Sequence, residues 1–195
     1  MRWMLSFHWV CSEALTEGSV ADTGDSGGAR WRVFVSHTSE LRDLPAGRSY
    51  VAAVERAISA CGHVIVDMAD FPAADLPAAE LCRERVRSCD VYVGVLGARY
   101  GSVVPDTPQV SYTELEFDTA IAAGLPRLIF MLDTDTALAG IPLSRPIGLE
   151  LDERQEEFRR RVKAGLVTQS FTDPATLGNW WNVRCASWPH RGPAL

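Results

Sequence analysis

The run DVYVGVLG (residues 90–97) decides the fold of this chain. After its first residue the run carries no charge, whereas a strand with one solvent-exposed face alternates apolar and polar side chains. A continuous apolar run of this length is typical of a strand buried on both faces of a parallel sheet. The run therefore predicts a central strand that is covered by helices on both sides.

The segments on either side of this run repeat the same alternation of strand and helix. Four further runs are predicted strands: WRVFVS (31–36), HVIVDM (63–68), RLIFMLD (127–133) and LVTQSF (166–171). The segments 49–61, 77–89, 111–123 and 153–165 have helical patterns. Five strands that alternate with helices predict an α/β fold, a single doubly wound parallel sheet of five strands. We expect the flavodoxin-like order 2-1-3-4-5, with a ligand crevice at the carboxyl ends of strands one and three.

Composition limits the class of protein. The 195 residues are 47% hydrophobic and 23% charged, which is typical of one soluble globular domain. A formal net charge of −6 argues against nucleic acid or an anionic membrane as a partner, because both need a basic surface. The five cysteines contain no C-x-x-C pair, and the four histidines lack metal-ligand spacing. We therefore expect a reduced, cytoplasmic protein with no membrane span, no bound metal and no cofactor.

The two ends of the chain differ from the middle. Residues 12–30 are rich in Gly, Ser and acidic side chains, which is linker composition, and we expect 1–30 as a whole to be a disordered tail or linker. Its GDSGG run (24–28) matches the nucleophile signature of trypsin-like proteases, but the upstream His and Asp framework of those enzymes is missing, so we interpret it as a hinge. The domain is expected to cover 31–178.

The last predicted helix begins near residue 174, with Asp173 as its N-cap and Pro174 at its first position. The following segment, 179–195, has no periodicity and holds three of the six tryptophans. A shifted reading frame of this segment can encode an amphipathic helix. We therefore hypothesise that 179–195 is an aberrant tail produced by a frameshift, and the alternative is a genuine divergent tail.

Two loops are expected at the mouth of the crevice. In SHTSE (36–40), Ser36, His37 and Ser39 either bind a sugar or phosphate or cap the following turn. In LGARYGS (96–102), Gly97 permits close backbone approach, and Arg99 and Tyr100 are suited to grip an anion or stack on a ring. The alternative for Arg99 is a salt bridge to Glu116 or Asp67.

The helix 111–123 carries the candidate catalytic residue. Ser111 and Glu114 have the spacing of a capping box, which accounts for the first acidic side chain. Glu116 lies instead on a stripe with Tyr112 and Ala120 that is otherwise apolar or small. Either Glu116 faces the crevice as a general acid/base or as a carboxylate that stabilises an oxocarbenium-like centre, or it is a structural carboxylate paired with Arg99 or a backbone amide.

Four segments carry a resemblance to a known family: WRVFVSHTSELRDLPAG (31–47), HVIVDMADFPA (63–73), CDVYVGVLGARYGS (89–102) and SYTELEFDTAIAAG (111–124). They resemble the TIR-like domain-of-unknown-function family 4062, found at the N-termini of STAND-type NTPases and tetratricopeptide-repeat proteins. YTELE (112–116) is also similar to the W-C-x-x-E stretch of TIR domains, with Tyr112 at the aromatic position. In NAD-cleaving TIR domains the carboxylate at the position of Glu116 is catalytic.

A second, more distant similarity is to the nucleoside deoxyribosyltransferases, through Glu116, Ala120, Gly124 and Pro126. The resemblance implies an effector or signalling domain that cleaves the N-glycosidic bond of NAD or a related nucleotide. It also implies self-association and an attached NTPase and repeat region as partners. The alternative is a non-catalytic module that signals by self-association. Phe117, in place of the Leu usual after the TIR Glu, departs from the family pattern.

Overall fold

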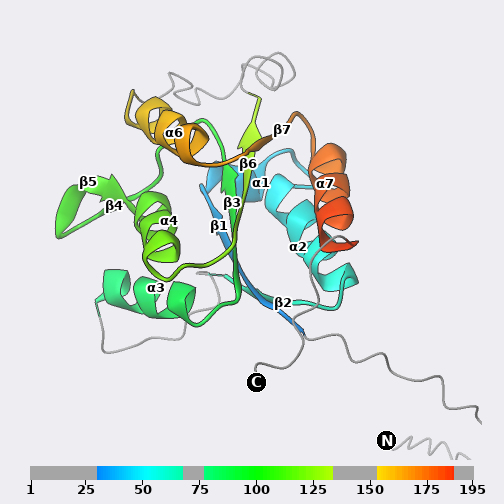
Figure 1. Cartoon of the computed structure of the whole chain (residues 1–195). Helices are drawn as coiled ribbons and strands as arrows, with labels where there is room; N and C mark the ends of the chain where they lie inside the picture. The colour runs from blue at the N-terminus through cyan, green and yellow to red at the C-terminus, as the bar shows by residue number, and fades with distance from the viewer. Residues whose placement is uncertain (1–29, 68–76, 134–152, 187–195) are drawn as a thin grey trace, which may run out of the picture.

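The computed structural model describes residues 30–67, 77–133 and 153–186, the last five of them (182–186) by their backbone alone. One sheet organises these residues (Figure 1). Its strands are β1 (Arg32–His37), β2 (Val64–Val66), β3 (Val91–Leu96), β6 (Arg127–Leu132) and β7 (Gln169–Phe171). All neighbouring pairs are parallel, in the order β2-β1-β3-β6-β7. This is the predicted order 2-1-3-4-5, so the fold prediction is confirmed.

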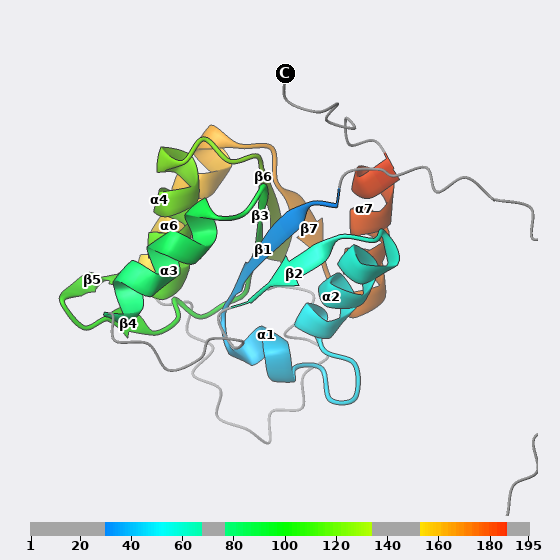
Figure 2. The same cartoon turned by 90° about the horizontal axis from the view of Figure 1, so that it is seen from below.

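Helices cover both faces of the sheet, as Figures 1 and 2 show from two directions. One face is covered by α2 (Tyr50–Ala60) and α7 (Pro174–Ala186), and the other by α3 (Ala78–Arg87), α4 (Tyr112–Ala122) and α6 (Glu153–Gly165). A short helix, α1 (Glu40–Asp43), follows β1. Each face has its own hydrophobic core. All six residues of β3 are buried, because this strand lies in the middle of the sheet and is covered on both sides.

The helix boundaries follow from capping side chains and glycines. The hydroxyl of Ser49 accepts a hydrogen bond from the Ala52 N–H at 3.1 Å, which begins α2. Gly62, with φ +77°, follows the end of that helix, and Gly124, with φ +65°, follows the end of α4. A left-handed backbone at these positions costs glycine little. These glycines turn the chain into β2 and β6.

Helix α7 begins as predicted and then continues beyond the expected boundary. Asp173 Oδ1 accepts hydrogen bonds from the N–H groups of Ala175 and Thr176, both at 2.9 Å, so Asp173 is the predicted N-cap. The helix runs on to Ala186, and Trp181 is buried against the core at 2% exposed. Residues 179–186 are therefore helical although their sequence lacks periodicity. The frameshift hypothesis stays a prediction, and the remainder of the proposed tail and residues 1–29 lie outside the described residues.

A small hairpin between β3 and α4 was not predicted. Its strands, β4 (Val103–Val104) and β5 (Thr107–Ser111), are antiparallel and project from the domain (Figure 1). Tyr100 holds the hairpin to the domain, because its hydroxyl oxygen lies 3.0 Å from the Gln109 carbonyl. Arg154 of α6 donates to the Pro108 carbonyl at 2.9 Å. The hairpin is thus fixed by contacts from two elements rather than by a core of its own.

Candidate active site

Glu116 is the most deeply buried carboxylate of helix α4. Ser111 fixes the start of the helix, because its Oγ accepts a hydrogen bond from the Glu114 N–H at 3.2 Å. Glu116 comes one turn later on the face that packs on the sheet, and it is 4% exposed. The inward orientation expected from the sequence is therefore what the structure has.

Two neutral side chains bind the Glu116 carboxylate. The hydroxyl of Ser36, from the carboxyl half of β1, donates to Oε2 at 2.5 Å, and the thiol of Cys82, from α3, donates to Oε1 at 3.5 Å. Within the described residues, no ion pair joins Glu116 to Arg99, whose side chain is exposed. The alternative in which Glu116 is a structural partner of Arg99 is thus not what these residues show.

Burial determines the protonation of this carboxyl. Removal from water raises the pKa of Glu116 from 4.5 to about 7, although the hydrogen bonds from Ser36 and Cys82 and the charge of His37 act in the opposite direction. Burial and the nearby Glu116 carboxylate also raise the pKa of the Cys82 thiol, which stays protonated and unreactive. Glu116 therefore exchanges a proton near neutral pH, in a setting that excludes water.

Tyr92 completes the cluster and was missed in the sequence. It is fully buried between Phe34 and Phe117, and its hydroxyl has no hydrogen-bond partner among the described residues. Burial and Glu116 raise the pKa of this phenol well above its usual value. The ring lies over Gly94, where a Cβ would come within 3.1 Å of Tyr92 Cε1. Alternation along 90–97 puts residues 92 and 94 on one face, which was the available signal.

His37 lies at the end of β1 and belongs to a separate charged group. Its Nε2 is 3.6 Å from Oδ2 of Asp67, and Arg42 binds the same carboxylate. Its Nδ1 is 3.1 Å from the Thr38 carbonyl. Burial disfavours the charged imidazole, but Asp67 and the Thr38 carbonyl outweigh burial, so the pKa of His37 is raised. Asp67 is thus occupied by Arg42 and His37, and no ion pair with Arg99 is seen within the described residues.

The other predicted binding residues have different positions. Ser39 is exposed before α1 and makes no side-chain cap, so its capping alternative is wrong. Tyr112 is partly buried at the start of α4. The Gly97 carbonyl accepts hydrogen bonds from Gln155 and Arg159 of α6, both at 2.9 Å. This glycine is therefore held in place by the helix that covers it.

Tyr100 and Glu114 bind each other. The Tyr100 hydroxyl donates to the Glu114 carboxylate and accepts from the Ser111 N–H at 3.3 Å. Glu114 also pairs with Arg161 at 2.7 Å, so its side chain does not reach back to the N-cap amide. Half of the predicted capping box is present and the other half is replaced by Tyr100. The phenol of Tyr100 supports the hairpin and α4.

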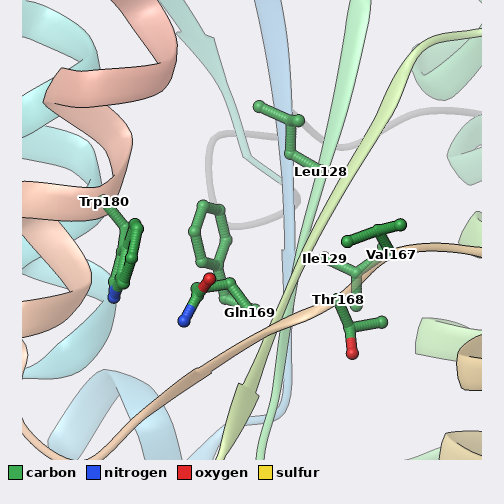
Figure 3. Close-up of a pocket in the computed structure, with 7 residues that line it drawn as sticks. Leu128, Ile129, Val167, Thr168, Gln169 and Trp180 are labelled. Atoms are coloured by element: carbon green, nitrogen blue, oxygen red, sulfur yellow. The ribbon is translucent and has the colours of Figure 1, made fainter.

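A separate hollow lies on the other side of the domain (Figure 3). It is open, has a volume of about 250 Å³, and runs along β6, β7 and α7. Its walls are formed by Leu128, Ile129, Phe130, Val167, Thr168, Gln169 and Trp180. None of these seven side chains titrates near neutral pH, so the hollow offers no acid or base. Glu116 is not among its lining residues.

Neither a metal site nor a membrane span is found in the part of the chain that the structure describes. Across 30–67, 77–133 and 153–186, no group of three or more His, Cys, Asp and Glu side chains is placed to hold a metal ion. In the same part of the chain, no helix combines the length and apolar character needed to cross a bilayer.

Fold and site together define a doubly wound α/β domain with a buried carboxylate beside its first strand. The model of a domain of unknown function, DUF4062, matches residues 32–184, and the chain belongs to that family. A search of curated proteins finds no match.

Two solved structures are similar in fold. A 2-desoxiribosyltransferase from Leishmania mexicana has a TM-score of 0.45 and 13% identity, over 78% of this chain and 97% of that chain. The flavoenzyme NAD(P)H:(acceptor) oxidoreductase FerB from Paracoccus denitrificans has a TM-score of 0.43 and 13% identity, over 80% and 96%. At these scores neither similarity bears on function.

Proposed function

We propose that this domain cleaves the N-glycosidic bond of NAD or a related nucleotide, with Glu116 as the catalytic carboxylate. The observation that carries the proposal is the environment of Glu116: a carboxylate 4% exposed, bound by the neutral donors Ser36 and Cys82, beside the carboxyl half of β1. A structural carboxylate at such depth is ordinarily paired with a cation. In the proposed reaction the substrate supplies the positive charge.

The chemistry needs few groups. In NAD the bond between C1′ of the ribose and the pyridinium nitrogen breaks, and its electron pair goes to that nitrogen, so nicotinamide leaves as a neutral base. Glu116 stabilises the oxocarbenium-like centre and hydrogen-bonds the ribose hydroxyls, as carboxylates do in glycoside cleavage. Water then attacks C1′ and gives its proton to Glu116. The products are ADP-ribose, nicotinamide and one proton.

The roles of the remaining residues follow from their places. Ser36 holds the carboxylate in position through its 2.5 Å hydrogen bond. His37, at the end of the same strand, adds positive charge near Glu116 when it is protonated. Because Glu116 is almost completely covered, the substrate must displace side chains at the strand ends to reach it. We further propose that the domain is a cytoplasmic effector module. Copies of it self-associate, and it is attached to an NTPase and repeat region.

The test is nicotinamide release from NAD by the full chain, compared with Glu116→Gln and Asp118→Asn. Asp118 is the matched control because it lies on the same helix, because its replacement removes the same charge, and because its half-exposed side chain pairs with Arg161. We expect release by the wild type and by D118N, and a loss of about 100-fold or more in E116Q.

Two results would contradict the proposal. Equal release by E116Q would exclude Glu116 as the catalytic group. No release from NAD, NADP or nucleosides by folded wild-type protein, over a range of protein concentrations, would favour the non-catalytic self-association module.

A further inference from the structure

A second carboxylate, Glu40, lies where the ends of β1 and β3 meet. Its Oε1 accepts a hydrogen bond from the Thr38 hydroxyl at 2.7 Å and another from the Arg99 N–H at 3.2 Å. The same oxygen lies against Gly97, where an added Cβ would be only 2.3 Å from it. We call the place of this oxygen the oxyanion position. It is defined by the Thr38 hydroxyl, the Arg99 N–H and the bare Cα of Gly97.

The carboxylate is poorly satisfied there. Its second oxygen, Oε2, is buried and has no hydrogen-bond partner among the described residues. No cation pairs with Glu40 within those residues either, and Arg99, whose backbone N–H binds Glu40, has an exposed side chain. Burying part of a charge without a partner costs free energy. If this side chain only joined the two loops, a neutral hydrogen-bond acceptor such as Gln would do so without the cost of a partly buried charge.

The location is the one at which ligands bind in this fold. The strand order extends from β1 to β2 on one side and from β3 to β6 and β7 on the other, so the topological switch point of the sheet lies between β1 and β3. In open α/β sheets the ligand crevice lies outside the carboxyl ends of strands at this point. Gly97 directly follows β3, and Thr38 directly follows β1. The oxyanion position is therefore inside the expected crevice.

We propose that the oxyanion position is a subsite for a phosphate group of the substrate, and that Glu40 is its occupant in the ligand-free domain. This inference rests on the proposed function for the class of substrate, a nucleotide. A phosphate oxygen makes the same hydrogen bonds as a carboxylate oxygen, and the missing side chain at Gly97 leaves it room. When phosphate enters, Glu40 leaves and the Arg99 guanidinium supplies the counter-charge.

The proposal has a consequence for specificity. A nucleotide that carries phosphate competes with Glu40 for the oxyanion position, whereas a nucleoside without phosphate does not use it. Removing the charge of Glu40 should therefore strengthen binding of phosphorylated ligands and leave nucleosides unaffected. A residue that merely fastened the two loops would act in the opposite direction, because its loss would loosen the crevice for every ligand.

The experiment is calorimetric binding of ADP-ribose, inorganic pyrophosphate and adenosine to the full chain. ADP-ribose is the product of the proposed reaction, so its binding is measured without turnover. We compare the wild type with Glu40→Gln, which keeps the shape, and with Asp43→Asn, an exposed acid on the same short helix. A third variant, Arg99→Ala, removes the exposed guanidinium.

We expect E40Q to bind ADP-ribose and pyrophosphate about tenfold more tightly than the wild type, the effect of losing one charged competitor. D43N should stay within about twofold, and adenosine should bind all proteins equally. R99A should bind ADP-ribose about tenfold more weakly. R99A tests the proposal if E40Q does not fold, since an R99A protein with unchanged affinity for ADP-ribose would overturn it.

Other outcomes would also overturn it: an E40Q protein that binds ADP-ribose no better than the wild type, an equal gain for adenosine, or no binding of ADP-ribose to either. Failure of the proposed function gives a different result. If E40Q tightens ADP-ribose while NAD is never cleaved, the phosphate subsite stands and the glycohydrolase does not.

Discussion

Replacing Glu116 with Gln should make the domain more stable, and the gain should grow with pH. In the folded chain burial raises the pKa of this carboxyl from 4.5 to about 7. Between these two values the folded state holds a proton that the unfolded state has released, so wild-type stability falls as pH rises. The stability that the protonated Glu116 carboxyl contributes is fully present below the unfolded pKa of 4.5, and it is lost as the pH rises through the folded pKa of about 7.

The magnitude follows from the two pKa values. A rise from 4.5 to about 7 corresponds to about 3 kcal/mol of unfolding free energy at high pH, since each tenfold change in proton affinity is about 1.4 kcal/mol. Of this, about 2.5 kcal/mol should develop between pH 5 and pH 8. Gln keeps an oxygen that accepts from Ser36, and it has no proton to lose in this range.

The assay is urea unfolding of wild type, E116Q and D118N across that pH range. The difference in unfolding free energy between E116Q and the wild type should increase steadily with pH. Titrating groups that do not interact with Glu116 are common to both proteins and cancel in the difference, so that apart from the titration of Glu116 only its coupling to His37 remains. D118N removes an exposed charge from the same helix and should differ from the wild type by a nearly constant amount.

Parallel stability curves for the wild type and E116Q would refute the reasoning, because Glu116 would then titrate as an exposed carboxyl. A wild type that gains stability over E116Q as pH rises would refute it more strongly. That result would mean that an unrecognised cation stabilises the charged carboxylate.

Three further substitutions, one of them with a matched control, test the packing on both faces of the sheet. Arg159→Ala should lower the unfolding free energy, measured in urea, by about 3 kcal/mol. The guanidinium binds the carbonyls of Leu96, Gly97 and Leu132 at 3.4, 2.9 and 2.7 Å. A loss below about 0.5 kcal/mol would show that water replaces it. Leu177→Ala should lower the unfolding free energy by about 3 kcal/mol, because it leaves a cavity under α7. The control Val167→Thr, at a position 92% exposed, should lower it by less than about 0.5 kcal/mol. Equal effects would mean that α7 contributes little to the core. Tyr92→Phe should be neutral or stabilising by up to about 1 kcal/mol, because the buried hydroxyl it removes has no described partner, and clear destabilisation would reveal one.

The sheet could be predicted because its signal is local. Four of the five strands lie in short apolar runs, and the order follows from the connections between parallel strands. The signal for the direction of Glu116 was also local, since helical periodicity alone placed it opposite the two partly buried acids Glu114 and Asp118. What surrounds that carboxylate was not local: Cys82 and Ser36 are 34 and 80 residues away in the chain. Such contacts are set by packing between elements, which sequence spacing does not encode.

Two features of this region were not foreseen, for the same reason. Tyr100 stays a predicted binding residue, but its hydroxyl contacts Glu114 and the Gln109 carbonyl, after the chain folds back through the hairpin. The hairpin itself gave little signal, because β5 contains Pro108 and is mostly exposed, so it lacks the apolar alternation of a half-buried strand. In both cases a turn between β3 and α4 brought together groups that look independent in the sequence.

The bare Cα of Gly94 has a consequence for how this domain can change over evolutionary time. A Cβ there would come within 2.9 Å of Ile129 and 3.1 Å of the Tyr92 ring, and Gly94 is the register partner of Ser36 on β1. Any larger residue would have to displace the Ile129 side chain or the Tyr92 ring, beside the strand position that pairs with Ser36. The packing of the sheet and the surroundings of Tyr92 are therefore inherited together at this position, and a lineage that lost this glycine would have to repack both.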